Sequence, residues 1–261
     1  MTHPEVLTRE QRRLLLDYLG QFVTEHKKRR MREVLAWRTR HVVLVLEDIY
    51  QPQNASATLR TAEILGLLDI FIVENRNAYR LNPDVTLGAN KWVNLHRFRQ
   101  PQTDNTAAAI AHLRQRGYLL VATSPHKAGY PPEAIPLERP LAFWFGNELE
   151  GLSAQALDAA DMYVRLPMFG FTESYNISVS VAITLYTVVR RLHASQVPWR
   201  LTPDEQEEVL LTWYRRVIGS KWRHIEADFW RRRQAMADDG SPNPTGPGTQ
   251  GEPTPDQPES F

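Results

Sequence analysis

Three stretches of this 261-residue chain carry polar side chains that could bind a ligand or move a proton. Asn54 and Arg60 follow the apolar run 41–47, and Gly146-Asn147-Glu148 follow the run 141–145. Ser174-Tyr175-Asn176 precede an apolar helix that is expected from residue 176. Polar groups beyond the carboxyl ends of parallel strands lie in the crevice where open α/β sheets bind ligands. The sequence therefore predicts one polar site assembled from three separate loops.

The third stretch is a loop that leads into a helix. Pro167 and Gly170 favour a turn, and either Ser174 or Asn176 suits the N-cap of the helix that follows. Backbone N–H groups at a helix N-terminus can hold a small polar ligand. The alternative interpretation is a turn, a cap and a core helix without a ligand.

The other polar residues also have purely structural interpretations. Asn54 suits a helix N-cap, Arg60 a solvated helix arginine, and Glu148 an acid near the start of a helix expected from residue 153. On a regular helix Arg60 points about 120° away from Asn54, because six residues separate them. A shared role for the two therefore requires Asn54 to lie in the loop before the helix.

The composition excludes several classes of site. The chain has no cysteine, which excludes disulfides and thiolate metal sites and favours a reducing compartment. It has no phosphate-binding loop, no G-x-G-x-x-G fingerprint and no G-x-S-x-G nucleophile elbow. The histidines at 96, 112 and 126 lack the spacing of metal ligands. Without a visible signal peptide or membrane-spanning run, we expect a soluble, cytoplasmic protein that needs no metal.

The formal charge of +1 at pH 7 conceals an asymmetry along the chain. Residues 238–261 include five acidic residues and no lysine or arginine. Basic residues cluster over 27–32, 215–223 and 231–233. Such clusters suit phosphate contacts, and a solvated helix face has the same composition.

Short apolar runs alternate with helix-like segments along the middle of the chain. We expect strands over 41–47, 69–73, 118–122, 141–145 and 162–166, and helices over 54–66, 103–116, 153–160 and 176–193. The segment 74–92 is expected to be a loop. This alternation predicts an α/β fold with a largely parallel sheet.

Further helices are expected on both sides of this α/β region. Residues 8–37 have helical apolar spacing, interrupted at Gly20. Thr202 suits an N-cap, with Pro203 at the first position of a later helix. From Asp238 onward, the composition rich in Pro, Gly, Ser and acidic residues predicts a disordered tail.

Together the three polar stretches resemble the motifs of the SPOUT-superfamily RNA 2′-O-ribose methyltransferases. Within that group the chain resembles the TrmH family of tRNA guanosine-18 2′-O-methyltransferases, over residues 15–213. Motif 1 is Asn54-x5-Arg60-Thr61, and motif 2 is Phe145-Gly-Asn-Glu148 with Gly151-Leu-Ser153. Motif 3 is Leu166-Pro-Met-x-Gly170 with Ser174-x-Asn176-x-Ser178-Val179, and Lys91-Trp92-Val93 is also similar to the family.

The resemblance implies an α/β fold of the SPOUT type, in which the C-terminal part of a parallel sheet forms a deep trefoil knot. The implied organisation is a basic helical extension over 1–38, the methyltransferase domain over 39–195, a C-terminal helical extension over 196–236, and the acidic tail over 237–261. Both helical extensions would grip RNA.

The resemblance also implies S-adenosylmethionine as methyl donor, tRNA as substrate, and a homodimer that completes the active site, with much of the interface on the helix 176–189. It implies catalytic roles for Arg60, Asn54, Glu148, Ser174 and Asn176. It implies cofactor contacts for Thr123, Gly146, Asn147, Leu166, Met168, Tyr175 and Ser178. Tyr175 stands where many relatives have an aliphatic residue.

Arg60 has two interpretations within this reaction. The resemblance credits it with activating the ribose hydroxyl, but free arginine has a pKa above about 12 and is a poor base at neutral pH. We favour a role in which Arg60 binds the neighbouring phosphate and stabilises the developing alkoxide, while phosphate or water takes the proton.

Two alternative functions stay open at this point. One is ribosomal RNA 2′-O-methylation by the same chemistry. Relatives of that kind often carry a separate RNA-binding domain, whereas residues 1–40 here are only enough for short helices. The other is a non-catalytic RNA-binding dimer, against which the intact Asn54, Arg60, Glu148 and Asn176 argue. The sequence does not identify which tRNAs would be accepted.

Overall fold

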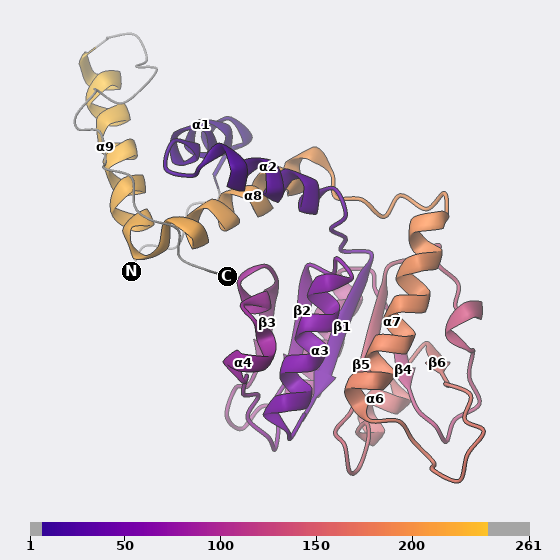
Figure 1. Ribbon diagram of the computed structural model, residues 1–261. Helices are drawn as coiled ribbons and strands as arrows, with labels where there is room; N and C mark the ends of the chain where they lie inside the picture. The colour runs from indigo at the N-terminus through magenta and orange to yellow at the C-terminus, as the bar shows by residue number, and fades with distance from the viewer. Residues whose placement is uncertain (1–6, 240–261) are drawn as a thin grey trace.

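We describe residues 7–239 of the chain from a computed structural model. Figure 1 shows a sheet flanked by helices, with a separate group of helices beyond one end of the strands. The helices are α1 (Arg9–Gly20), α2 (Glu25–Leu35), α3 (Pro52–Ile64), α4 (Pro83–Thr86), α5 (Asn105–Gln115), α6 (Ala154–Asp158), α7 (Ile177–Ala194), α8 (Pro203–Ile218) and α9 (Trp222–Asp239), with short 3-10 turns η1 (Ala89–Lys91), η2 (Pro132–Ala134) and η3 (Gly219–Lys221).

Six strands form one parallel sheet in the order β3-β2-β1-β5-β4-β6. They are β1 (Val42–Glu47), β2 (Asp69–Val73), β3 (Asn94–Phe98), β4 (Leu119–Thr123), β5 (Leu141–Phe145) and β6 (Met162–Val164). Strands β1, β2 and β5 are buried along their whole length, as expected for parallel strands covered on both faces. The predicted α/β class with a parallel sheet is confirmed.

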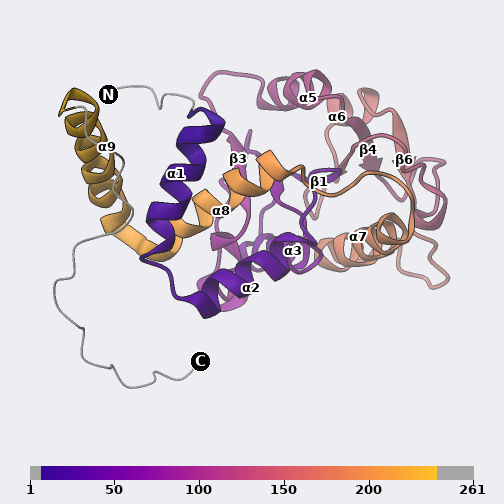
Figure 2. The ribbon, with the colours of Figure 1, turned by 90° about the horizontal axis from the view of Figure 1, so that it is seen from above.

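Helices cover both faces of the sheet. Helices α3 and α7 pack on one face, and α5 and α6 on the other, as the view from above shows (Figure 2). Alternate residues of β1 divide between the two cores, because successive side chains of a strand point to opposite faces. Leu44 belongs to the core under α3 and α7, whereas Val45 belongs to the core under α5.

A third core joins the helices that flank the α/β region. Helices α1, α2, α8 and α9 pack around Leu15, Leu19, Trp213 and Tyr214, and Leu68 at the start of β2 belongs to the same cluster. In Figures 1 and 2 these helices lie together although they come from both ends of the chain. The N-terminal and C-terminal helices therefore form one layer beyond the amino ends of the strands.

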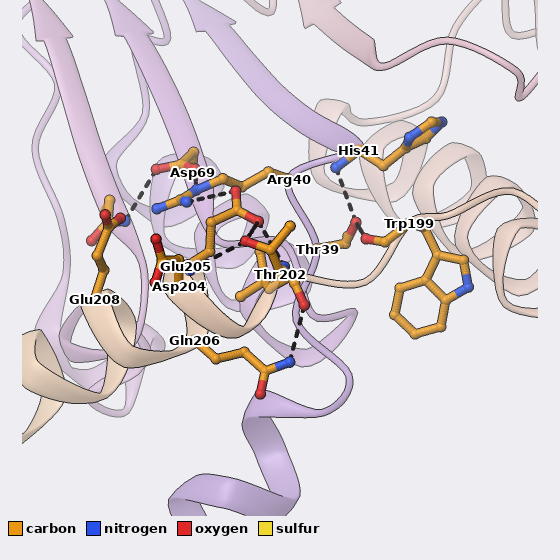
Figure 3. Close-up of polar contacts among 12 residues, drawn as sticks. Thr39, Arg40, His41, Asp69, Trp199, Thr202, Asp204, Glu205, Gln206 and Glu208 are labelled. Carbon is orange, nitrogen blue, oxygen red and sulfur yellow. Dashed lines mark hydrogen bonds and ion pairs between the residues drawn. The ribbon is translucent and has the colours of Figure 1, made fainter. Parts of the chain in front are cut away.

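A polar cluster fastens α8 to the sheet at this end (Figure 3). Arg40, just before β1, donates to Asp69 at 3.1 Å and to Glu205 of α8 at 2.9 Å. Thr202 is the N-cap of α8, as the sequence predicted, and Glu205 completes a capping box with it. One arginine thus connects the first strand, the second strand and the C-terminal helices.

Asp69 is the buried centre of this cluster. Its side chain accepts hydrogen bonds from His96 at 2.7 Å and from Asn94 at 3.1 Å, in addition to Arg40. Burial alone raises the pKa of Asp69, but the hydrogen bond from His96 and the charge of Arg40 outweigh it and hold this pKa below its ordinary value. The carboxylate is therefore charged in the folded protein.

One predicted helix boundary is wrong, and one strand was not predicted. The helix expected from Asn54 begins at Pro52, because proline is well suited to the first helical position, so Asn54 lies in the first turn of α3 and does not cap it. Residues 94–98 form the edge strand β3, which the sequence analysis missed. Its residues are only half-buried, and Asn94, His96 and Arg97 interrupt the apolar pattern.

The segment 74–92, expected to be a loop, contains the short helix α4 and the turn η1. Strand β6 ends at Val164, two residues earlier than expected. Of the tail expected over 237–261, residues 237–239 belong to α9, and residues 240–261 lie outside the described part of the chain. None of the helices described here is long and apolar enough to cross a membrane.

Asp69→Asn should destabilise the protein, since it removes the charge that pairs with Arg40. We expect the free energy of unfolding in urea at pH 7 to fall by about 1–3 kcal/mol. A carboxylate with a lowered folded-state pKa stabilises the fold above its unfolded pKa, and this contribution is lost as the pH falls. The difference from wild type should therefore shrink between about pH 5 and pH 2.

The matched control is Glu33→Gln, at an exposed acid of α2 whose one ion pair within residues 7–239 is with Arg30. It should change the free energy of unfolding by less than about 0.5 kcal/mol. A difference for Asp69→Asn that stays constant down to pH 2 would contradict the role assigned to its charge.

Candidate active site

A cavity lies beyond the carboxyl ends of β1, β4, β5 and β6, where an open parallel sheet binds ligands. Its volume is about 640 Å³. The three polar stretches of the sequence all contribute to its wall: Asn54, the loop 146–151 and residues 174–176. The predicted convergence of these loops is present in the structure.

Hydrogen bonds between side chains join the three stretches. Asn54 donates from Nδ2 to Glu148 Oε1 at 2.8 Å, and its Oδ1 accepts from Asn176 Nδ2 at 3.2 Å. The Asn54 side chain also donates to Gln51 Oε1 at 3.1 Å. Asn54 is 7% exposed, so these contacts satisfy a buried amide.

Glu148 acts on α3 as an external cap. Its carboxylate accepts from the backbone N–H groups of Tyr50 at 3.2 Å and Gln51 at 3.3 Å. The N-cap residue Gln51 makes no side-chain cap of its own. A negative charge is favourable at a helix N-terminus, so the loop after β5 and the start of α3 stabilise each other.

The loop after β5 is closed tightly on itself. Asn147 and Gly151 exchange two backbone hydrogen bonds of 3.0 and 3.1 Å, and Asn147 Oδ1 accepts from the backbone N–H groups of residues 149 and 150. A Cβ atom on Gly146 would lie 2.0 Å from the carbonyl carbon of Gly151. Only glycine therefore fits at position 146.

A buried carboxylate anchors the far end of this loop. Glu47, the last residue of β1, is 2% exposed. It accepts from Ser153 N at 3.0 Å, from Ser153 Oγ at 2.8 Å and from Thr106 Oγ1 at 2.7 Å. Sequence analysis treated Glu47 only as the end of a strand. The sequence does contain a signal for it, because Glu47 is an acidic residue that directly follows the apolar run 42–46.

The third stretch provides a helix cap rather than a free amide. Asn176 Oδ1 accepts from Ser178 N at 2.8 Å and from Ser178 Oγ at 2.6 Å, so Asn176 is the N-cap of α7, one of the two caps predicted. Ser174 lines the cavity, whereas Ser178 does not.

The residues expected to contact a cofactor are otherwise gathered at this cavity. Thr123 lies at its edge, where its Oγ1 donates to the Trp144 carbonyl oxygen at 2.8 Å. The other lining residues from the expected set are Gly146, Asn147, Leu166, Met168 and Tyr175.

Thr184 was missed by the sequence analysis. It lies within the buried stripe of α7, is fully buried, and its Oγ1 has no hydrogen-bond partner among the described residues. It lines the same cavity. The cavity that this orphaned hydroxyl lines also has apolar lining residues, among them Leu152, Leu157 and Val164, and such a mixture suits a ligand with both an aromatic ring and polar groups.

Arg60 does not reach this cavity. Both Asn54 and Arg60 belong to α3, six residues apart, and therefore point about 120° from each other. Arg60 is exposed, has no hydrogen bond or ion pair to another residue within 7–239, and lines a second cavity beside α2 and α8. Within one chain the structure does not bring Arg60 together with Asn54, Glu148, Ser174 and Asn176.

The side chains of the described residues do not form a metal-binding cluster. Within residues 7–239 no group of three or more His, Asp or Glu side chains could hold a metal ion.

Comparison with known proteins agrees with the geometry. Residues 41–186 match the model of the SpoU rRNA Methylase family, and this range contains all three loops. A Borreliella burgdorferi protein named tRNA (guanosine(18)-2′-O)-methyltransferase is 46% identical over 200 residues, which cover 77% of this chain and 89% of that protein.

Solved structures are similar as well. The crystal structure of an Aquifex aeolicus TrmH/SpoU tRNA modifying enzyme matches with a TM-score of 0.64 and 27% identity, over 73% of this chain and 95% of that one. An AdoMet-bound rRNA methyltransferase from Sinorhizobium meliloti shares the fold, with a TM-score of 0.51 and 24% identity over 62% of this chain and 60% of that one.

Glu148→Ala should make the start of α3 open more often, because it removes the acceptor for the backbone N–H groups of Tyr50 and Gln51. We expect the amides of Tyr50 and Gln51 to exchange roughly 2- to 10-fold faster, as measured by hydrogen–deuterium exchange. Glu150→Ala is the control, since Glu150 is in the same loop but pairs with Arg76 on the surface. Equal effects of both variants at these two amides would contradict the cap.

Proposed function

The chain belongs to the SpoU rRNA Methylase family, and on that premise we propose that it methylates the ribose 2′-oxygen of guanosine 18 in tRNA with S-adenosylmethionine as donor. It is an RNA 2′-O-ribose methyltransferase. The observation that carries the choice of substrate is the 46% identity to a relative named for tRNA guanosine 18, over 89% of that relative.

S-adenosylmethionine would supply an electrophilic methyl group on a sulfonium. The residues proposed to hold it are those of the cavity at the strand ends: Thr123, Gly146, Asn147, Leu166, Met168 and Tyr175, with Ser178 acting through the Asn176 cap. The fit rests on the apolar walls, the backbone of the tight loop 146–151 and the orphaned hydroxyl of Thr184.

The transfer forms a bond between the ribose 2′-oxygen and the methyl carbon, while the sulfur–methyl bond breaks and the hydroxyl proton leaves. We assign Arg60 to the phosphate next to the target ribose, where its charge stabilises the developing alkoxide. The proton then passes to phosphate or water. Asn54, Glu148 and Asn176 keep the loops in place, and Ser174 is available to hydrogen-bond the substrate.

In a homodimer, Arg60 of one protomer could lie close to Asn54, Glu148 and Asn176 of its partner. Support comes from α7, whose exposed side includes Val179, Ile183 and Tyr186, at 43%, 38% and 57% exposure. Their spacing forms an apolar stripe along one face of the helix, which would be covered by a second copy. In that arrangement Arg60 of one protomer faces the cavity of its partner.

The proposal also includes the knot, the domain organisation and the cellular location that the family resemblance implies. We propose that the C-terminal part of the sheet is knotted, that the helical extensions 1–38 and 196–236 flank a methyltransferase domain over 39–195, and that the protein acts on tRNA in the cytoplasm. The exposed basic residues of α2 support an RNA contact on this extension: Lys27, Arg29, Arg30 and Arg32.

The function is tested with labelled S-adenosylmethionine and two tRNA transcripts. Transfer to unmodified tRNA, and none to the same tRNA with 2′-deoxyguanosine at position 18, is the expected result, because only a ribose has the acceptor hydroxyl. Equal labelling of both would move the target to another nucleotide. No label in either, together with label in ribosomal RNA, would favour the ribosomal substrate.

The composite site is tested by mixing two inactive variants, Arg60→Ala and Asn176→Ala. Each alone should lose at least about 100-fold in kcat. After the subunits are unfolded together and refolded, activity should return to about a quarter of wild type, since half of the randomly assorted dimers then contain one intact site. No recovery would place Arg60 and Asn176 of the same protomer in one site.

A further inference from the structure

A second cavity of about 410 Å³ lies on the other side of α3 from the first. It is an open cavity lined by residues of α2, α3, the segment from α4 to η1, and α8. Its volume falls within the range of about 300–1,000 Å³ that is typical of small-molecule sites. The function proposed above uses Arg60 at its edge and leaves the cavity itself without a role.

The walls of this cavity are apolar and partly aromatic. Met31 and Val34 come from α2, and Trp92 and the largely buried Trp213 also line the cavity. Ile64 and Leu87 stand at its mouth, at 68% and 67% exposure. Unstacked RNA bases bind in such places, between aromatic and apolar side chains.

Positive charge surrounds the mouth. Arg60 has no partner within the described residues, and Arg30 pairs only with the exposed Glu33, at 3.3 Å. Both line the cavity. A ligand that combines a flat ring with a phosphate would satisfy both the walls and the mouth, and a nucleotide of RNA has this chemistry.

One negative group faces the cavity, and it is held in a fixed position. Arg38, which is 1% exposed, forms an ion pair with Glu63 Oε1 and donates to the Glu63 carbonyl oxygen at 2.9 Å. Glu63 Oε2 has no hydrogen bond from a described residue. The buried arginine therefore orients a carboxylate that has free acceptor capacity.

Arg60, Glu63 and Ile64 lie on one face of α3, because residues three and four apart are neighbours on a helix. If Arg60 acts at the ribose and its phosphate, the base of the same nucleotide comes within reach of Glu63. Guanine is the base whose Watson–Crick edge presents two adjacent donors, N1–H and the N2 amino group, to a carboxylate.

We infer that this cavity is the guanine-recognition site of the enzyme, where the base of the methylated nucleotide enters between the apolar walls and Glu63 accepts hydrogen bonds from N1–H and N2–H. The inference rests on the proposed function and deepens it. Glu63 would then be the residue that selects guanosine at the target position.

The test compares single-turnover methyl transfer to tRNA transcripts that carry guanosine, inosine or adenosine at position 18. Wild type should favour guanosine over adenosine by about 10- to 100-fold, with inosine between them, since inosine lacks the N2 amino group. In Glu63→Gln both preferences should shrink to within a few-fold, because an amide both accepts and donates. Comparing ratios between variants cancels any effect of the base on the fold of the tRNA.

Glu33→Gln is the matched control, because Glu33 is an acid of α2 that does not line the cavity. It should retain the wild-type preference. An unchanged preference for guanosine in Glu63→Gln would overturn the inference and leave the proposed function intact. No methyl transfer to any of the three tRNAs by wild type would overturn both.

A second variant covers the case in which Glu63→Gln fails to fold after losing its contact with Arg38. Ile64→Trp places an indole at the exposed mouth, and should lower kcat/KM for tRNA by about 10-fold or more, with the Kd for S-adenosylmethionine unchanged. Phe22→Trp, at an exposed aromatic outside both cavities, is the control. A wild-type kcat/KM for tRNA in Ile64→Trp would overturn the inference. Loss of dimers by this variant on gel filtration would also overturn it, because the cavity would then belong to a contact between two copies of the chain.

Discussion

The carboxylate of Glu148 is the contact on which the arrangement of the site depends. It accepts from the Asn54 side chain and from the backbone at the start of α3, a helix whose own N-cap residue supplies no acceptor. Asn176 then joins Asn54 from the N-terminus of α7. These hydrogen bonds hold three segments that are far apart in the chain together along one side of the cavity. They also provide acceptors for the backbone N–H groups at the start of α3.

Helix α3 also separates two of the residues that the sequence placed in one site. A rigid helix holds Asn54 and Arg60 on different sides, so Asn54 lines the cavity at the strand ends and Arg60 lines the second cavity. No rotamer of Arg60 removes a 120° difference in direction. This difference in direction is the physical reason for the homodimer proposed above.

The two ends of the sheet have different roles. At the carboxyl ends, polar groups line a cavity and Glu47 supports the loop from behind. At the amino ends, the ion pairs of Arg40 and Asp69 attach the layer formed by α1, α2, α8 and α9. The second cavity is lined by residues of α2 and α8 from this layer and by residues of α3, Arg60 among them.

Local patterns in the sequence were sufficient to predict the helices and strands whose formation depends on a few neighbouring residues. The apolar runs predicted β1, β2 and β5, and the cap residues Asn176 and Thr202 predicted two helix starts, since burial on both faces and capping depend on neighbours along the chain. The edge strand β3 escaped, because a half-buried strand has no such pattern.

Only the tertiary structure decided which side chains meet. Pro52 set the start of α3 and with it the direction of Asn54. The parallel register of β1 with β5 brought Glu47 behind the loop 146–151. The cavity beside Arg60 is lined by helices from both ends of the chain together with α3, and proximity between segments so far apart leaves no periodic trace in the sequence.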